Sequence, residues 1–160
     1  MYIKKEDDLG NVCEIILSNN SKFYLSQSER IKALKEIIEP FKKYGFQAKK
    51  PEIIDLCEFI KYSIRNYKDW VSNQKKRKNP IGIVYHIPSS NILLMPFYSW
   101  IPSFLCGNHN FIRISNSIDK KIIENLVEIL DIFLGENYKY SQIFFEDTSE
   151  NIKSELVSFN

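Results

Sequence analysis

Amide and hydroxyl side chains gather in one turn near the middle of the chain, where they could contact a ligand. The turn Pro88-Ser89-Ser90-Asn91 follows the short apolar run 82–87 and precedes a mainly apolar stretch, residues 92–105. The Asn91 amide could donate a hydrogen bond to a ligand lying across the end of a strand. It could instead cap the following helix, because asparagine is a favoured N-cap residue. The local chemistry leaves both interpretations open.

Arginine and histidine near this turn widen the range of possible chemistry. Arg113 lies near the end of the next β-type run, residues 110–114, where a cation could bind a ribose or its 2′-phosphate. It could equally pair with an acid at the sheet edge. His86 could be a packed strand residue or a proton carrier. The sequence offers Ser89 and Ser90 no matching histidine and aspartate, so a serine hydrolase is not indicated.

The elements that would position these residues form one βαβ unit over residues 80–115. A strand, a turn and an apolar helix precede Cys106-Gly107-Asn108, where glycine can close a helix in the left-handed region without strain. A second strand follows. Two strands joined in this way lie parallel through a crossover, which places the turn at the carboxyl edge of the sheet. Ligands of open α/β sheets bind at that edge, so chemistry is expected around residues 88–91 and Arg113.

The alternation of strand and helix continues after the βαβ unit. Apolar residues recur at helical spacing from Ile122 to Phe133, with Ser117 as a candidate cap and Gly135 as the closing residue. Residues 141–146 then predict a third strand. This order is typical of a parallel sheet in an α/β fold.

The first half of the chain predicts mainly helices. Residues 12–17 form a short β-branched run typical of an edge strand or a hairpin arm. Residues 26–29, Ser-Gln-Ser-Glu, have the spacing of a capping box and should begin a helix that Pro40 ends or kinks. Pro51 suits the first turn of a longer helix with a broad apolar face. The polar, basic stretch that follows, residues 73–80, is typical of a solvated linker rather than a nucleic-acid or phosphate contact.

Bulk composition excludes several classes of protein. The 160 residues are 44% hydrophobic and 26% charged, and the net charge of +2 gives no general case for a nucleic-acid partner. There is no apolar run of about 18 residues and no signal-peptide core, which predicts a cytoplasmic protein without a membrane span. No metal site is expected, because the cysteines and histidines lack metal-ligand spacing: Cys13, Cys57, Cys106, His86 and His109.

Two stretches carry a resemblance to a known family. Residues 82–91, GIVYHIPSSN, and residues 107–115, GNHNFIRIS, resemble the nucleotide-binding core of the aldehyde dehydrogenase superfamily. The similar branch is the LuxC family, the fatty-acyl-CoA reductases of bacterial bioluminescence. The sixteen-residue interval from Asn91 to Gly107 agrees with that branch, as does Arg113, where ordinary aldehyde dehydrogenases usually carry lysine. Before Pro80 the resemblance is only a pattern of helices and lengths.

This resemblance implies a fold, a cofactor and a set of site residues. The implied fold is an aldehyde-dehydrogenase-like, Rossmann-type parallel sheet flanked by helices, incomplete, with an N-terminal helical segment before it. Residues 1–79 would be a strand and helices that pack on the nucleotide domain, and residues 80–160 a partial NAD(P)-binding domain. Asn91 would be catalytic, donating its amide to the oxyanion of a tetrahedral intermediate. The residues implied to bind NADPH are Ile87, Pro88, Ser89, Ser90, Arg113 and Ser115.

The sequence also departs from expected patterns. It has no GxGxxG fingerprint, and the family's nucleophilic cysteine and catalytic domain lie beyond the place where this sequence ends. We therefore expect the N-terminal part of an enzyme that reduces fatty acyl-CoA to an aldehyde with NADPH through a thioester, inactive alone and completed by a missing C-terminal part. The alternative is a degenerate or split-protein fragment that acts as an interaction module and docks on a protein partner.

Overall fold

A parallel sheet lies at the centre of the protein. The computed structural model describes residues 1–4, 25–72, 82–135 and 141–146, and in these residues the sheet has four strands in the order β1-β4-β3-β2. Every neighbouring pair is parallel. The predicted α/β class with a parallel sheet flanked by helices is confirmed. The strands are β1 (Tyr2–Ile3), β2 (Ile83–His86), β3 (His109–Ile114) and β4 (Gln142–Glu146).

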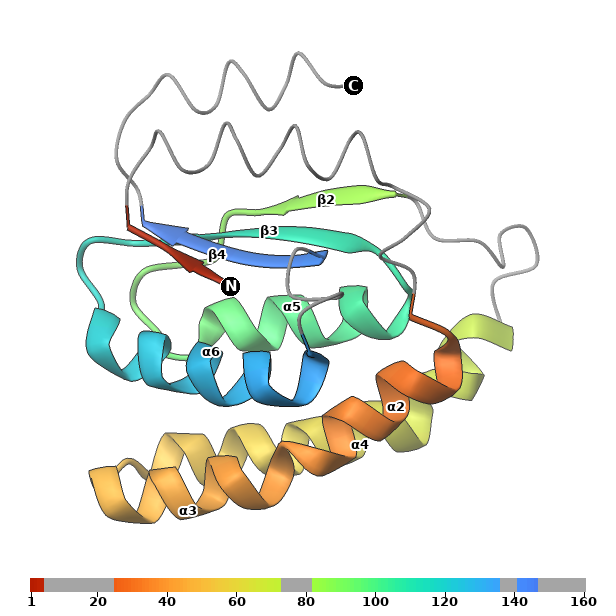
Figure 1. Ribbon diagram of the computed structural model, residues 1–160, viewed down its shortest axis with the longest axis horizontal. Coiled ribbons are helices and arrows are strands. Elements are labelled where there is room, and N and C mark those ends of the chain that lie inside the picture. Colours follow the sequence, from red (N-terminus) through yellow and green to blue (C-terminus); the bar gives the residue numbers. More distant parts are fainter. Residues whose placement is uncertain (5–24, 73–81, 136–140, 147–160) are drawn as a thin grey trace.

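Two helices connect these strands and cover one face of the sheet. Helix α5 (Met95–Leu105) joins β2 to β3, and α6 (Lys120–Leu134) joins β3 to β4. Both lie on the same side of the sheet (Figure 1), because successive right-handed crossovers that advance in one direction place their helices on one face.

The strands β3 and β4 are buried on both faces. Successive residues of each strand belong alternately to two hydrophobic clusters, one on each face of the sheet. Phe111, Ile143 and Phe145 belong to a second buried cluster on the face away from α5.

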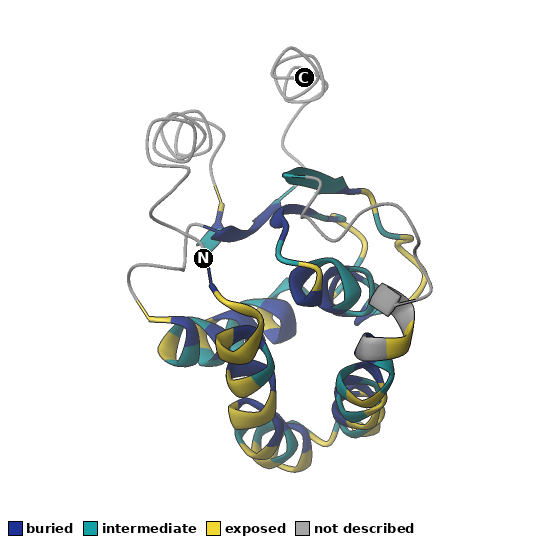
Figure 2. Ribbon diagram, turned by 90° about the vertical axis from the view of Figure 1, so that its right-hand side faces the viewer, coloured by how far each residue is buried: buried dark blue, intermediate teal, exposed yellow. Residues whose placement is uncertain are grey.

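A second helical layer packs against α5 and α6. It contains α2 (Gln27–Glu36), α3 (Ile38–Ala48) and α4 (Pro51–Ser72), and the buried sides of these helices face inward (Figure 2). Phe97 of α5 joins the layers. Its ring centroid lies 5.9 Å from that of Phe41 in α3 and 5.0 Å from that of Phe144 in β4. One hydrophobic core therefore extends from the sheet to the outer helices.

The start of α2 and its break before α3 follow local sequence rules. The predicted capping box is confirmed, because the Ser26 hydroxyl accepts from the Glu29 amide and the Glu29 carboxylate accepts from the Ser26 N–H at 2.7 Å. The helix ends at Glu36, and Pro40 lies in the first turn of α3. The proline has no N–H for the Glu36 carbonyl, and its ring clashes with that carbonyl, so the break precedes the proline.

Helix α5 ends as predicted but begins later than Asn91. Gly107 has φ +87°, and its N–H donates to the Phe104 carbonyl while the Asn108 N–H donates to the Ser103 carbonyl. At the other end Leu94 is the N-cap and no side chain caps the helix. The interpretation of Asn91 as a helix cap is therefore wrong.

The cap predicted for α6 is also wrong. The N-cap is Asp119, again without a side-chain hydrogen bond, whereas Ser117 lies in the preceding turn. The Ser117 N–H donates to the Ser115 hydroxyl at 3.3 Å. The serine-rich stretch therefore stabilises a local turn, and the helix begins three residues further on, at Lys120.

A buried arginine, which the sequence pattern did not indicate, ties α2 to α5. Arg30 is only 8% exposed, and its Nε donates to the carbonyl of Leu105 at 3.1 Å. A second guanidinium nitrogen donates to the carbonyl of Leu25. Leu105 is the last residue of α5, so the cation satisfies a carbonyl at the negative end of the helix dipole.

Candidate functional site

The carboxyl edge of the sheet brings most of the predicted site residues together. Strands β2 and β3 are parallel neighbours with His86 paired to Ile112, so the chain leaves both strands at the same edge. The β2–α5 turn (residues 87–94) begins there and carries Asn91, while Arg113 and Ser115 lie at the end of β3. Ile87 is 60% exposed, and Ser89, Ser90 and Asn91 are exposed. This edge is the candidate site.

Asn91 presents a hydrogen-bond donor in the exposed part of the turn. Its side-chain oxygen accepts from the Ser89 hydroxyl, which turns the amide nitrogen away from that serine. No residue in the described part of the chain accepts a hydrogen bond from this nitrogen. The amide can therefore donate to a ligand at the sheet edge.

The end of β3 and the start of α6 carry the basic side chains of the edge. Arg113 is half-buried and shares a sheet face with Phe111, away from α5. Helix α6 begins close by without a side-chain cap, and its first turn contains two lysines and no acid. Lys120 pairs with Glu146 at 2.6 Å and Lys121 lies 3.7 Å from Glu124. The uncapped N–H groups of α6 favour an anion at this place.

His86 is a packed residue of β2 whose ring nitrogens are both engaged. It is 7% exposed, and its Nδ1 and Nε2 lie 2.6 Å from Ser99 Oγ and 2.9 Å from Asn110 Oδ1. The packed interpretation of His86 therefore describes the structure. Its neighbours Asn110 and Gln142 belong to a buried polar network across three strands, which apolar periodicity alone did not reveal.

The buried histidines predict a loss of stability in mild acid. Burial lowers the pKa of both His86 and His109 below the usual value of 6.5. Because the unfolded chain then binds more protons, the free energy of unfolding should fall as the pH drops below about 6.5 and through the lower folded pKa values. Urea denaturation between pH 8 and pH 5 measures this.

The control for the acid effect is the variant His86→Gln/His109→Gln, which removes both titrating rings. Its unfolding free energy should depend less on pH over the same range. An equal pH dependence in the variant and the natural chain would contradict the assignment to these histidines.

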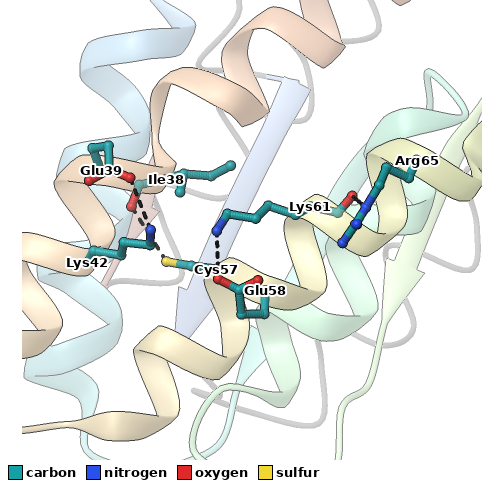
Figure 3. A network of polar contacts seen from close by, with 7 residues as sticks. All are labelled: Ile38, Glu39, Lys42, Cys57, Glu58, Lys61 and Arg65. Atoms are coloured by element: carbon teal, nitrogen blue, oxygen red, sulfur yellow. Dashed lines mark hydrogen bonds and ion pairs between the residues drawn. The ribbon is translucent and has the colours of Figure 1, made fainter.

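Neither described cysteine has the environment of an activated nucleophile. Cys57 is buried in α4, and its Sγ donates to the Ile38 carbonyl at 3.6 Å beside the Lys42–Glu39 and Lys61–Glu58 pairs (Figure 3). Burial raises the pKa of its thiol to about 11. Cys106 is the exposed C-cap of α5, and partial desolvation raises its pKa as well. Both thiols therefore stay protonated at neutral pH.

Grouped metal ligands and membrane-spanning helices were sought in the described segments. Within residues 1–4, 25–72, 82–135 and 141–146, no three histidine, cysteine, aspartate or glutamate side chains are grouped so as to hold a metal ion. No helix in the same segments combines the length and the apolar character that crossing a bilayer requires.

Comparison with known proteins identifies a family. The family model described as Acyl-CoA reductase (LuxC) matches residues 21–157, which is more than half of the 160-residue chain. No curated protein and no solved structure matches the chain. The family match includes the β2–α5 turn and the end of β3, so it covers the whole candidate site.

Proposed function

The chain belongs to the LuxC family of acyl-CoA reductases, and we propose that it is the part of such an enzyme that holds NADPH beside an acyl thioester. In the reaction proposed, a cysteine thiolate displaces CoA from fatty acyl-CoA, and hydride reduction of the resulting thioester releases the aldehyde. NADPH, when bound, supplies the hydride. The observation that supports the proposal is that the exposed β2–α5 turn and the end of β3 share one carboxyl edge.

The residues at this edge suit a nucleotide that carries an additional phosphate. The exposed side chain of Ile87 and the backbone of residues 88–90 offer a surface for the flat nicotinamide ring. Arg113 and Ser115 would contact the adenosine ribose and its 2′-phosphate, because guanidinium binds phosphate in two-pronged geometry. The uncapped start of α6 adds N–H donors for an anion at the same carboxyl edge.

The start of α5 is less suited to the pyrophosphate than in a glycine-rich dinucleotide fold. The Met95 and Phe97 amides already donate to the carbonyls of Ile92 and Leu94, at 3.2 and 3.0 Å, and Pro96 between them has no N–H. These groups are therefore occupied within the chain. We infer that the phosphates lie toward α6 rather than on the N-terminus of α5.

Asn91 has the role of oxyanion donor in this proposal. Its amide nitrogen faces away from Ser89 and stands in an exposed part of the turn, so it can reach the carbonyl oxygen of a thioester held at the edge. A preorganised donor of this kind stabilises the charge that develops on that oxygen in the transition state.

NADPH binding by the isolated 160-residue chain tests the proposal directly. The chain, shown to be folded by circular dichroism, should enhance and saturate the fluorescence of added NADPH. A folded chain with no saturable binding of NADPH or NADH would exclude the nucleotide assignment.

Arg113→Met should change the preference between the two nicotinamide nucleotides. Loss of the guanidinium removes a charge-assisted hydrogen bond to the 2′-phosphate, so the Kd for NADPH should rise roughly tenfold while that for NADH changes little. Fluorescence titration of both nucleotides measures the ratio.

Arg65→Met is the matched control for this titration, because Arg65 is an exposed arginine on α4, in the helical layer that α5 and α6 separate from the sheet (Figure 1). It should leave both Kd values unchanged. If Arg113→Met weakened the binding of NADPH and NADH equally, the arginine would not recognise the 2′-phosphate.

A further inference from the structure

One tryptophan sets the polarity of a buried hydrogen-bond chain beneath α5. The indole N–H of Trp100 can only donate, and it donates to the side-chain oxygen of Gln142 in β4. The same oxygen accepts from the Asn110 amide nitrogen in β3 at 2.8 Å. The Gln142 amide nitrogen donates to the Ser141 hydroxyl at 3.0 Å. The orientation of both amides follows from the indole.

The chain continues from Asn110 to His86 and defines the tautomer of the imidazole. The Asn110 amide nitrogen uses its second hydrogen on the Asn108 carbonyl at 2.7 Å, so its oxygen faces His86 Nε2 and accepts from it at 2.9 Å. Nε2 therefore carries the proton. In the neutral ring Nδ1 then accepts from the Ser99 hydroxyl at 2.6 Å. Both ring nitrogens are satisfied without a charge.

The position of His86 allows this network to hold the two ends of the β2–α5 turn. His86 is the last residue of β2, which in the described sheet pairs with β3 alone. Ser99 lies in α5, so the His86–Ser99 bond closes the loop that the β2–α5 turn forms. Asn110 connects the same imidazole to the interior of the sheet. The two ends of the turn are thus held in a defined relative position by one side chain.

We propose that His86 is a positioning residue for the β2–α5 turn. It acts through Ser99 and Asn110 to hold the turn, and thereby Asn91 and the nucleotide-facing backbone, in the geometry that binds ligand. The imidazole takes no part in proton transfer. The ligand side of this inference rests on the proposed function, whereas the effect on the turn can be measured without a ligand.

Five variants of the 160-residue chain test the proposal, one of them the double variant His86→Ala/Asn110→Ala. His86→Ala and Asn110→Ala remove the network at two points, while His86→Gln keeps a donor for Asn110 and an acceptor for Ser99. Val127→Ala removes a fully buried methyl pair from α6 and is the control for general destabilisation. Two quantities are measured for each variant: the amide hydrogen exchange of residues 87–94, and the Kd for NADPH.

His86→Ala and Asn110→Ala should each accelerate exchange selectively in residues 87–94. Each should also raise the Kd for NADPH roughly tenfold, which corresponds to the net contribution of about one hydrogen bond. The double variant His86→Ala/Asn110→Ala should bind NADPH no more weakly than either single variant, because both act on one network. His86→Gln should recover most of the lost affinity. Exchange and Kd in His86→Ala that match those in Val127→Ala would overturn the proposal.

The two proposals can fail separately. If the natural chain binds no NADPH, the proposed function fails, and the exchange data alone decide the role of His86. Selective acceleration in residues 87–94 then supports positioning of the turn, and uniform or unchanged exchange contradicts it.

Discussion

Replacing Asn91 by alanine is expected to lower kcat for acyl-CoA reduction about 100-fold in an enzyme that contains this chain, with the Kd for NADPH nearly unchanged. The structure places the Asn91 amide in the exposed turn at the carboxyl edge, with its oxygen bound to Ser89 and its nitrogen available as a donor. A donor that acts on charge developing in the transition state contributes to kcat rather than to nucleotide binding. Steady-state kinetics with a fatty acyl-CoA and a separate NADPH titration distinguish the two.

Asn116→Ala is the matched control, because Asn116 is also an exposed asparagine, located after β3 at the same sheet edge. It should retain kcat. Asn91→Asp should lose at least as much activity as Asn91→Ala, because a carboxylate repels the oxyanion. Full kcat in Asn91→Ala, or an equal loss in Asn116→Ala, would exclude the oxyanion role.

Phe97→Ala is expected to lower the free energy of unfolding by about 4 kcal/mol. The ring is fully buried and contacts aromatic rings of α3, α5 and β4, with Phe144 at 5.0 Å and Trp100 at 6.2 Å between centroids. Its loss leaves a cavity where the three layers meet, and surrounding elements can relax only in part. Natural domains are stable by roughly 5–15 kcal/mol, so the variant should be close to unfolding.

Urea denaturation followed by Trp fluorescence measures this loss. Phe46→Ala is the control, because the Phe46 side chain on α3 is 73% exposed and should contribute less than about 0.5 kcal/mol. Equal unfolding free energies for the two variants would show that Phe97 does not hold the layers together.

Local patterns in the sequence were sufficient for most of the secondary structure. The capping box at Ser26 and Glu29 and the left-handed closure at Gly107 involve groups only a few residues apart, so their chemistry can be read directly from spacing. The alternation of strands and helices likewise predicted that β2, β3 and β4 run parallel to one another. The residue pattern of the βαβ unit also indicated the family that the comparison then matched.

Helix starts were less predictable, because several polar residues compete for the same turn. Asn91 and Ser117 are both good caps by residue type, yet α5 and α6 begin three or more residues after them. Ser89 binds the Asn91 side chain and Ser115 binds the Ser117 amide, so local turns take the groups that capping would have used.

Sequence alone therefore determined the class of fold and the order of its main elements, because these depend on periodicity and on interactions between near neighbours. The family was indicated separately, by the resemblance of residues 82–91 and 107–115. Tertiary structure alone decided which polar groups meet. The backbone of Tyr2–Ile3 pairs with β4, although the two segments lie at opposite ends of the chain. Arg30 donates to the last carbonyl of α5, and His86 forms a hydrogen bond with Asn110. Such buried groups need partners that are distant in the chain, and only the folded arrangement of layers brings those partners within hydrogen-bond distance.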